Sequence, residues 1–342
     1  MNFLQYSEAF KKKAIDATFS EEEVQQCLDY ARPIVERNLP VIYNTTHLAA
    51  LVGYRKVYLK KAAIYTSYFY RKFVISKRNG KPRTISEPLP SLKEIQSWIL
   101  RNILENVQVS KFAKAYLQNR NIRDNAKHHI GKSVILKVDI QDFFGSISQE
   151  AVEQIFLNLN YSSNISNLLS KLCTLEKSLP QGAPTSPYLS NLYLSQFDEV
   201  VGNYAVKAKL RYTRYADDIT FSGDFDPDEV LIFLEKELME LKLQLNKRKT
   251  MIMRHHKRQF VTGIIVNKKM QVPREERQNL RLEMHFIEKF GLKSHLERIG
   301  NKKDNYLEHL IGRINFFTTI NPEDKEFIKY KQFILEKYWK TL

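Results

Sequence analysis

The stretch Arg211-Tyr-Thr-Arg-Tyr-Ala-Asp-Asp-Ile-Thr-Phe-Ser222 places two adjacent carboxylates, Asp217 and Asp218, between segments rich in β-branched and aromatic residues. Such flanks are typical of strands, so the stretch predicts a hairpin with the acids at its tip. Consecutive side chains on a straight strand point to opposite faces, and only a turn lets both acids approach one site. A solvated turn, in which aspartate is common, is the alternative for Tyr-Ala-Asp-Asp taken alone.

A third acid ends another strand-like segment. Residues 133–140 are mostly apolar and reach Asp139, which is followed by Asp142, Phe143 and Phe144. Magnesium prefers oxygen ligands and usually binds one or two carboxylates together with substrate phosphates. Two such ions about 3.5 to 4 Å apart can activate an attacking hydroxyl and stabilise the leaving oxygen in phosphoryl transfer. Three acids on neighbouring strands suit that chemistry.

The composition favours a nucleic-acid partner. The formal net charge is +16 over 342 residues, and 43% of the residues are hydrophobic, so the chain is globular and strongly basic. Each Lys or Arg that neutralises a phosphate releases a counterion, although a solvated basic surface is the alternative. No apolar run of about 18 residues and no apolar signal core are present, so we expect a cytoplasmic protein with no membrane partner. Cys27 and Cys173 form no metal-spacing pattern.

Helical and strand-like segments alternate along the chain. Capping boxes at Ser20–Glu23 and Ser91–Glu94, and prolines after Ser186 and Asp226, predict helix starts. Segments 134–140, 210–221 and 260–266 are predicted to be strands of one sheet. Strands interrupted by long helices predict an α+β fold with a sheet packed on helices. From Pro273 onward the pattern is helical and basic, so a domain boundary is expected there.

These motifs resemble those of the reverse transcriptases. Tyr215-Ala-Asp-Asp218 matches the family's catalytic box, and Asp139-Ile-Gln-Asp-Phe-Phe144 is similar to its first aspartate motif. Leu179-Pro-Gln-Gly-Ala-Pro-Thr-Ser-Pro187 resembles the nucleotide and template loop, and Gly80-Lys-Pro-Arg83 the fingers segment that grips the triphosphate. The motifs occur in the family's order across residues 73–266. One departure is Gly145, where family members commonly have proline.

Two further segments resemble the bacterial retron type. Asn125-Ala-Lys-His-His129 fits the retron Asn-Ala-x-x-His pattern, and Val261-Thr-Gly263 fits its Val-Thr-Gly pattern. A chain without an endonuclease or RNase H extension favours the retron type over a group II intron enzyme. The resemblance implies a right-hand polymerase fold of fingers, palm and helical thumb. We expect a helical N-terminal region at 1–70, fingers and palm at 71–272, and the thumb at 273–342.

The resemblance also implies roles for single residues. The metal site, with two Mg²⁺ ions, would comprise Asp139, Ile140, Asp217 and Asp218, and the three acids would be catalytic. Contacts to the incoming dNTP would come from Lys81, Arg83, Phe144, Gln181, Gly182 and Lys249, with Phe144 as the steric gate against the 2′-hydroxyl and Lys249 as a proton donor to pyrophosphate. Recognition of the cognate RNA would involve Asn125, His129, Val261, Thr262 and Gly263.

The implied function is that of a retron RNA-directed DNA polymerase. It would copy part of a dedicated structured non-coding RNA from a guanosine 2′-hydroxyl into branched, RNA-linked single-stranded DNA (msDNA). With an effector protein encoded nearby, the complex would act in defence against phage. The alternatives are a group II intron-like or other bacterial reverse transcriptase, and a non-catalytic RNA-binding scaffold that keeps the fold.

Overall fold

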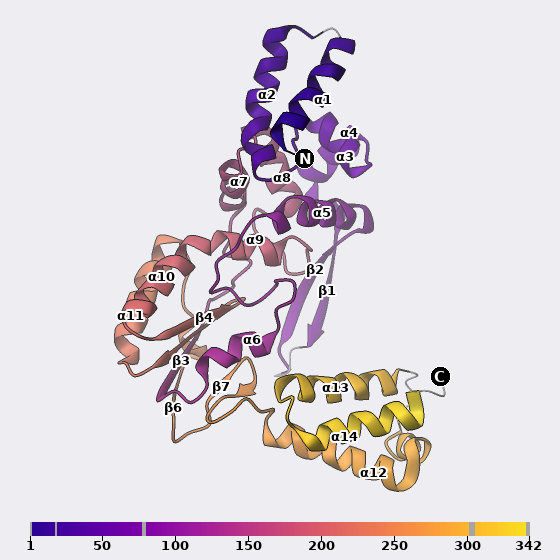
Figure 1. The fold of residues 1–342 in the computed structure, drawn as a ribbon, viewed down its shortest axis with the longest axis vertical. Coiled ribbons are helices and arrows are strands. Elements are labelled where there is room, and N and C mark those ends of the chain that lie inside the picture. The colour runs from indigo at the N-terminus through magenta and orange to yellow at the C-terminus, as the bar shows by residue number, and fades with distance from the viewer. Residues whose placement is uncertain (1, 18, 77–79, 301–304, 340–342) are drawn as a thin grey trace. The chain divides into compact units, whose positions relative to one another are not determined.

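The computed structural model describes residues 2–17, 19–76, 80–300 and 305–339. The chain forms two compact units, each assembled from separate stretches of sequence (Figure 1). The first unit comprises Met1–Gln118, Ile140–Val201 and Phe233–Leu245, and the second comprises Asn119–Asp139, Gly202–Ile232 and Asn246–Leu342. No helix within the described ranges is both long and apolar enough to span a membrane.

The first unit is mostly helical and carries one antiparallel hairpin. The hairpin pairs β1 (Tyr70–Ser76) with β2 (Pro82–Pro88), in a register that puts Tyr70 opposite Pro88. Its α-helices are α1 (Phe3–Asp16), α2 (Glu21–Glu36), α3 (Thr45–Val52), α4 (Lys56–Ile64), α5 (Pro90–Asn102), α7 (Gln149–Asn158), α8 (Ser163–Cys173) and α9 (Ser186–Tyr193). Short 3₁₀ turns are η1 (Thr66–Phe69) and η2 (Leu104–Asn106).

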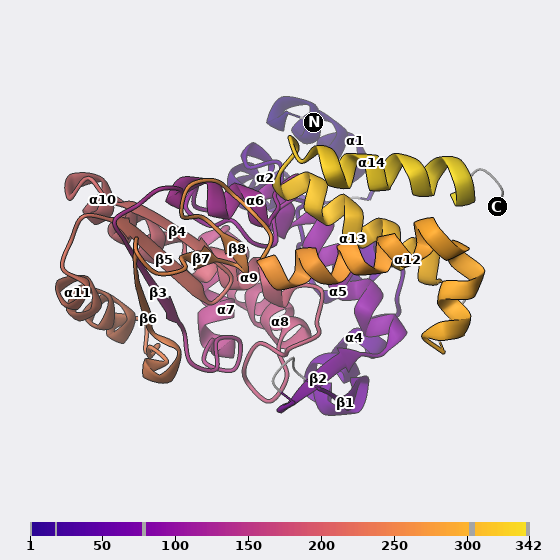
Figure 2. The same ribbon diagram turned by 90° about the horizontal axis from the view of Figure 1, so that it is seen from below.

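The second unit is built on a four-stranded antiparallel sheet in the order β4-β5-β3-β6 (Figure 2). The strands are β3 (Val134–Asp139), β4 (Arg211–Tyr215), β5 (Asp218–Gly223) and β6 (Met251–Arg254). A second hairpin joins β7 (Phe260–Val261) to β8 (Ile264–Ile265). Around them lie α6 (Ile122–Ala126), η3 (Lys127–His129) and η4 (Lys247–Lys249), while α10 (Ser195–Lys207) and α11 (Pro227–Glu240) have residues in both units.

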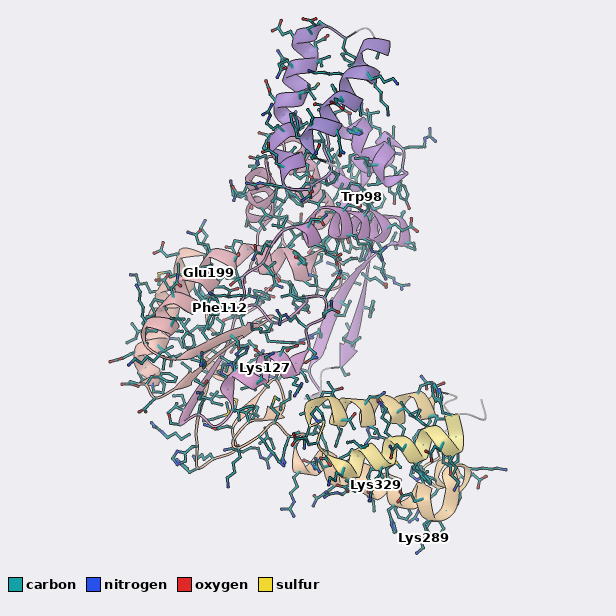
Figure 3. The ribbon with its side chains drawn as sticks, viewed as in Figure 1. Trp98, Phe112, Lys127, Glu199, Lys289 and Lys329 are labelled. Carbon is teal, nitrogen blue, oxygen red and sulfur yellow. The ribbon has the colours of Figure 1, made fainter. Side chains whose placement is uncertain are left out.

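Three C-terminal helices complete the second unit. They are α12 (Arg274–Arg298), α13 (Tyr306–Ile320) and α14 (Lys325–Ile334), followed by the π-turn η5 (Leu335–Trp339), and they lie side by side in both views (Figures 1 and 2). One buried cluster joins Leu310, Ile314 and Phe327 of these helices to Val261 and Ile264 of the small hairpin. Basic side chains such as Lys289 and Lys329 project outward from the bundle (Figure 3).

Of the two predicted capping boxes, one is confirmed and the other is wrong. Ser20 caps α2 and forms the expected capping box with Glu23. The box predicted at Ser91 is wrong, because α5 already begins at Pro90 and its N-cap is Leu89, which makes no side-chain cap bond. Proline at the first helical position starts that helix earlier. The predicted apolar face of α5 is nevertheless buried: Leu92, Ile95, Ile99 and Ile103 are fully inaccessible.

The prediction of a single sheet is wrong in one part. Segments 134–140 and 210–221 do form β3, β4 and β5 of the main sheet, but residues 260–266 form a separate two-stranded sheet. Three strands were missed: β1 and β2 of the hairpin, and the edge strand β6, which pairs with β3 from Val134↔Arg254 to Lys137↔Met251. The main sheet and the helices together give the α+β fold expected of a right-hand polymerase.

Candidate active site

The central strands of the main sheet bring two of the three acids face to face. In the antiparallel pairing of β3 with β5, Asp139 and Asp218 are directly opposite partners. Directly opposite residues on neighbouring antiparallel strands have Cβ atoms about 4.5 to 5.5 Å apart. The two acids, 79 positions apart in sequence, therefore share one end of the sheet.

Asp217 sits in the tight turn between β4 and β5. Tyr215 and Asp218 close the hairpin as register partners, so Ala216 and Asp217 are its two turn residues. Ala216 has a φ of 59°, in the left-handed region that non-glycine residues rarely adopt. The hairpin predicted from the sequence is thus confirmed, and its tip holds a strained residue next to an acid, as is common at functional sites.

The three carboxyl groups interact electrostatically. Burial, together with the negative charges of Asp139 and Asp218, raises the pKa of Asp217 to about 6, while Lys249 acts in the opposite direction. Asp139 is 6% exposed. A group of acids that oppose each other's ionisation is stabilised by a cation.

Two lysines partly supply that positive charge. Lys249 Nζ lies 2.8 Å from both carboxylate oxygens of Asp139, and Lys137 Nζ lies 2.8 Å from Oδ2 of Asp218. Lys249 is positioned by η4, which begins beside Asn246, whose backbone N–H donates to the Asp139 carbonyl at 2.7 Å. The Lys249 side chain is 59% exposed and so is able to leave Asp139 when another cation arrives.

The donor set fits a hard divalent cation that substrate oxygens help to hold. No three His, Cys, Asp or Glu side chains in the described part of the chain form a complete metal site by themselves. Magnesium needs only one or two carboxylates when phosphates and water supply the other ligands. Asp139, Asp217 and Asp218 carry carboxylate oxygens of this type. Ile140 is buried and bridges to Leu245, so only its backbone carbonyl could serve as a ligand.

A hollow of about 350 Å³ in the first unit collects predicted nucleotide-binding residues. Arg83 on β2 and Gln181 line it, together with Lys72 on β1 and Asp142. Lys72 was not predicted; its Nζ lies 2.7 Å from Glu176 Oε1. Lys81 lies one residue before β2 and is exposed. Two lysine or arginine side chains around one hollow favour an anionic ligand such as a triphosphate.

Gly182 shows why the loop before α9 needs a glycine. Its φ is 131°, and a Cβ there would lie 2.6 Å from the carbonyl oxygen of Ser86. The backbone N–H of Ser86 donates to the Gln181 carbonyl at 2.8 Å. Glycine thus permits a close backbone approach that ties this loop to strand β2.

The two adjacent phenylalanines after β3 have different environments. Phe143 is 4% exposed and belongs to the core. Phe144 is half-buried, with its ring centroid 5.2 Å from that of Phe143 and 6.4 Å from that of Tyr116. Gly145 follows, and a Cβ there would collide with the Asp142 side chain at 2.4 Å. Of the two rings, Phe144 is the one with accessible surface for a ligand.

The residues predicted to recognise RNA lie in two segments of the second unit, which are in contact with each other. Asn125 is fully buried on α6, and neither its amide nitrogen nor its amide oxygen has a hydrogen-bond partner. Val261 ends β7, and Thr262 and Gly263 form the turn to β8, with φ of 47° and 83°. Thr262 also has an unpaired buried hydroxyl. Strain and unpaired polar groups are common at ligand-binding positions. The RNA-recognition role stays a prediction.

His129 is buried inside the unit. Its Nδ1 lies 2.7 Å from Ser222 Oγ and its Nε2 lies 2.8 Å from Thr213 Oγ1, so the ring links η3 to strands β4 and β5. We expect His129→Ala to lower the free energy of unfolding by about 2–4 kcal/mol, because it removes two buried hydrogen bonds and leaves a cavity. Denaturant unfolding measures this. The exposed Lys127→Ala variant is the control and should change stability by less than about 1 kcal/mol. Equal stability of the two variants would contradict the structural role.

The raised pKa of Asp217 gives a prediction about stability. The folded protein keeps the proton of Asp217 to a higher pH than the unfolded chain does. The free energy of unfolding therefore falls as pH rises from about 4 to 6, and the loss persists above pH 6. In metal-free buffer, Asp217→Asn is therefore expected to raise the free energy of unfolding by about 1–3 kcal/mol at pH 7.5 and to leave it nearly unchanged at pH 4. Urea unfolding at both pH values tests this. Asp224→Asn, an exposed acid beyond the other end of β5, should have no effect at either pH.

Comparison with known proteins identifies the family of the chain. A family model described as reverse transcriptase (RNA-dependent DNA polymerase) matches residues 75–273. The chain is 32% identical over 321 residues to the retron Ec86 reverse transcriptase of Escherichia coli, covering 92% of this chain and 97% of that protein. It is 30% identical to the retron Mx65 reverse transcriptase of Myxococcus xanthus, covering 84% and 71%. A telomerase structure from Candida albicans aligns at a TM-score of 0.47 and 11% identity, over 80% of this chain and 64% of that one.

Proposed function

Because this chain belongs to the bacterial retron-type reverse transcriptases and is an RNA-directed DNA polymerase of that family, we propose that it makes msDNA. In this proposal it copies part of a dedicated structured non-coding RNA, starting from a guanosine 2′-hydroxyl, and leaves a branched RNA–DNA molecule. The observation that carries the polymerase assignment is the pairing of Asp139 with Asp218 across two strands, with Asp217 in the adjoining turn.

The acids would hold two Mg²⁺ ions. When bound, these ions activate the primer hydroxyl and stabilise the oxygen that leaves with pyrophosphate. Asp139, Asp217 and Asp218 orient the reacting groups, and their mutual repulsion favours cation binding. Lys249, whose Nζ contacts Asp139, would be the residue that donates a proton to pyrophosphate.

The hollow on the first unit would hold the triphosphate of the incoming dNTP. Of the residues that line it, Arg83 would supply positive charge and Gln181 an amide. Lys81, exposed next to β2, would add positive charge, and Gly182 would allow a close backbone approach. Phe144 would crowd a ribose 2′-hydroxyl and so select deoxynucleotides. The resemblance to the family assigns these residues and the three acids to one reaction.

Arg83 offers a test of this assignment. We expect Arg83→Ala to raise the KM for dNTP about tenfold with a smaller change in kcat, because a charge-assisted contact to phosphate is lost. Steady-state primer extension at varied dNTP measures both constants. Arg71→Ala is the matched control: Arg71 lies on the same hairpin but pairs with Glu87 at 2.6 Å and does not line the hollow. A KM equally altered in both variants would contradict the assignment.

Recognition of the cognate RNA would involve Asn125, Val261, Thr262 and Gly263, with His129 acting through the strands it holds. The region 1–70 would form an N-terminal extension, 71–272 the fingers and palm, and 273–342 the thumb, whose exposed lysines would contact duplex phosphates. The complex would act in the cytoplasm with an effector protein encoded nearby, in defence against phage. That last step follows from resemblance alone.

Sequencing the nucleic acid that co-purifies with the protein from its own host tests the proposal. A single-stranded DNA joined through a 2′ branch to a short RNA is the expected result. Unbranched cDNA would instead indicate another type of bacterial reverse transcriptase, such as a group II intron enzyme. Failure to extend any primer with magnesium present would indicate a scaffold that binds RNA without catalysis.

A further inference from the structure

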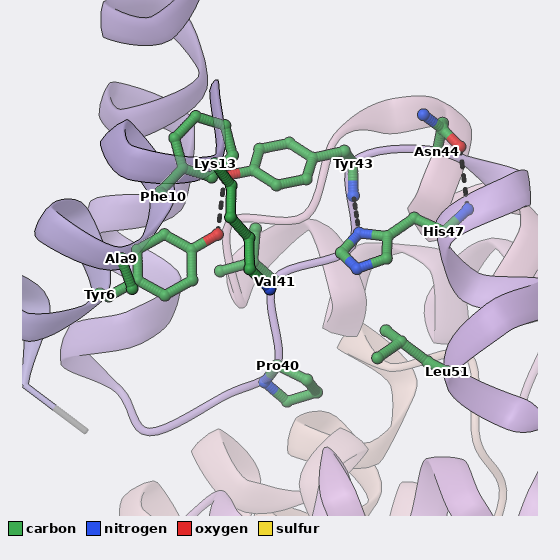
Figure 4. A pocket seen from close by; sticks show the side chains of 10 residues that line it. All are labelled: Tyr6, Ala9, Phe10, Lys13, Pro40, Val41, Tyr43, Asn44, His47 and Leu51. Atoms are coloured by element: carbon green, nitrogen blue, oxygen red, sulfur yellow. Dashed lines mark hydrogen bonds between the residues drawn. The ribbon is translucent and has the colours of Figure 1, made fainter. Parts of the chain in front are cut away.

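A hollow of about 610 Å³ lies in the N-terminal part of the first unit, far in sequence from the catalytic motifs (Figure 4). One wall is the face of α1 that carries Tyr6, Phe10 and Lys13, which follow each other at helical spacing. The opposite wall is formed by Tyr43, which lies just before α3, and by His47 in the first turn of α3. The volume falls within the range of about 300–1,000 Å³ that is typical of ligand sites.

The walls present aromatic rings in fixed positions. Tyr43 and His47 are stacked, with ring planes 14° apart, and Tyr6 and Phe10 are stacked at 17°. The Tyr6 and Tyr43 hydroxyls are 2.8 Å apart and hydrogen-bonded, which ties the two walls together (Figure 4). Asn44 holds the start of α3 by accepting from the His47 backbone N–H at 3.0 Å. Phe10 and Tyr30 also contact Tyr43, each with ring centroids 5.7 Å from it, so the rings form one cluster. The half-buried rings of Tyr6 and Phe10 give this cluster a stacking surface for a nucleobase.

The positive charge of the lining favours a polyanionic ligand over a basic peptide. None of the residues that line the hollow is acidic and Lys13 is one of them, with Lys11 and Lys12 exposed beside it on α1. A lysine next to stacked rings is the combination that holds a phosphate beside an unpaired base.

A second hollow of about 400 Å³ adjoins the first and shares Tyr6, Pro40 and Val41 with it. Its lining includes the amide side chains of Asn38, Asn102 and Asn106. The Nδ2 atoms of Asn102 and Asn106 donate to backbone carbonyls at 2.9 and 2.8 Å, which orients the side-chain oxygens as acceptors. Amides recognise base edges and the ribose 2′-hydroxyl, so this hollow favours RNA over an apolar peptide.

We propose that the two adjoining hollows bind an unpaired stretch of RNA. One base stacks on the half-buried rings of Tyr6 and Phe10, Lys13 contacts a phosphate, and the asparagines bind the neighbouring nucleotide. This stretch is held by the N-terminal helices and not by the polymerase residues. The inference uses only the enzyme's action on RNA and not the branched product proposed above.

Photocrosslinking tests this site. The full-length protein is irradiated with a single-stranded RNA of about ten nucleotides that contains 4-thiouridine, and with DNA of the same sequence that contains 4-thiothymidine. Mass spectrometry then locates the crosslinks. The RNA is expected to crosslink within residues 3–16 or 40–51, at least about fivefold more than the DNA. Crosslinks that map only to other segments, or equal crosslinking of DNA, would overturn the proposal.

Two neighbouring lysines supply the matched variants. Lys13→Ala should lower the yield of this crosslink about fivefold or more, whereas Lys12→Ala, exposed on the same helix but outside the lining, should not. Phe10→Leu keeps the apolar packing and removes the ring, and it should lower the yield to a similar extent. Equal yields from Lys13→Ala and Lys12→Ala would count against the site. Crosslinking needs no catalysis, so the experiment can be repeated with the Asp217→Asn enzyme. Loss of the crosslink would then indicate failure of this site, whereas loss of DNA synthesis alone would concern the proposed reaction.

Discussion

Replacing Asp217 with asparagine is expected to reduce DNA synthesis by about a thousandfold or more. The substitution keeps the shape of the side chain and removes one of the three negative charges at the end of the main sheet. Loss of a single charge-stabilising group in an active site commonly costs two to three orders of magnitude, and loss of a metal-binding carboxylate removes part of the metal site as well. Primer extension on a generic RNA template in magnesium buffer measures the rate.

The control for this experiment is Asp224→Asn, which removes an exposed acid beyond the far end of β5 and should leave the rate within about twofold of the native enzyme. Combined with the unfolding experiment, the Asp217→Asn variant is expected to be inactive and yet more stable than the native enzyme at pH 7.5. This combination is typical of residues whose charge serves function at the expense of stability. A variant that extended primers at the native rate would remove Asp217 from the catalytic site.

The second large effect is expected from Phe144→Ala. Removing the half-buried ring opens the space that would exclude a 2′-hydroxyl, and the preference for dNTP over rNTP should fall by about a hundredfold. The ratio of kcat/KM for dGTP and GTP on the same primer–template measures the preference. Most of the change should come from a higher kcat/KM for GTP, because the ring would exclude the ribonucleotide sterically.

Phe144→Tyr is the matched variant, because it keeps a ring of similar size and should retain selectivity. Phe143 cannot serve as the control, since it is a core residue whose truncation would destabilise the fold by about 3–5 kcal/mol. An unchanged dGTP to GTP ratio in Phe144→Ala would show that the ring only packs against Phe143 and Tyr116.

Local sequence signals predicted the end of the sheet that carries the three acids. The apolar run ending at Asp139 and the β-branched flanks of Asp217 and Asp218 identify β3, β4 and β5 because each signal lies within one element. The α+β architecture followed from the alternation of these strands with long helices. The β6 strand was missed because Met251–Arg254 is short and three of its four residues are exposed, so no alternating pattern marks it.

Features that depend on distant partners could not be predicted. In the sequence, Lys137 interrupts an apolar strand. In the structure it lies opposite Thr220, and its Nζ contacts Asp218. Lys72 lines the hollow beside Arg83 and also contacts Glu176, 104 residues away in the sequence. The buried hydrogen bonds of His129 likewise join segments more than 80 residues apart. Sequence spacing contains no information about such pairs.

The contact between Gly182 and Ser86 has a mechanical consequence. The backbone of the loop accepts a hydrogen bond from Ser86 of β2, and at Gly182 no side chain separates the loop from that strand. The hairpin and the loop are therefore expected to move together. Any swing of the hairpin on nucleotide arrival would then be transmitted to the segment expected to touch the template. The hydrogen bond from Ser86 to Gln181 would thus couple the position of the hairpin to that of the loop.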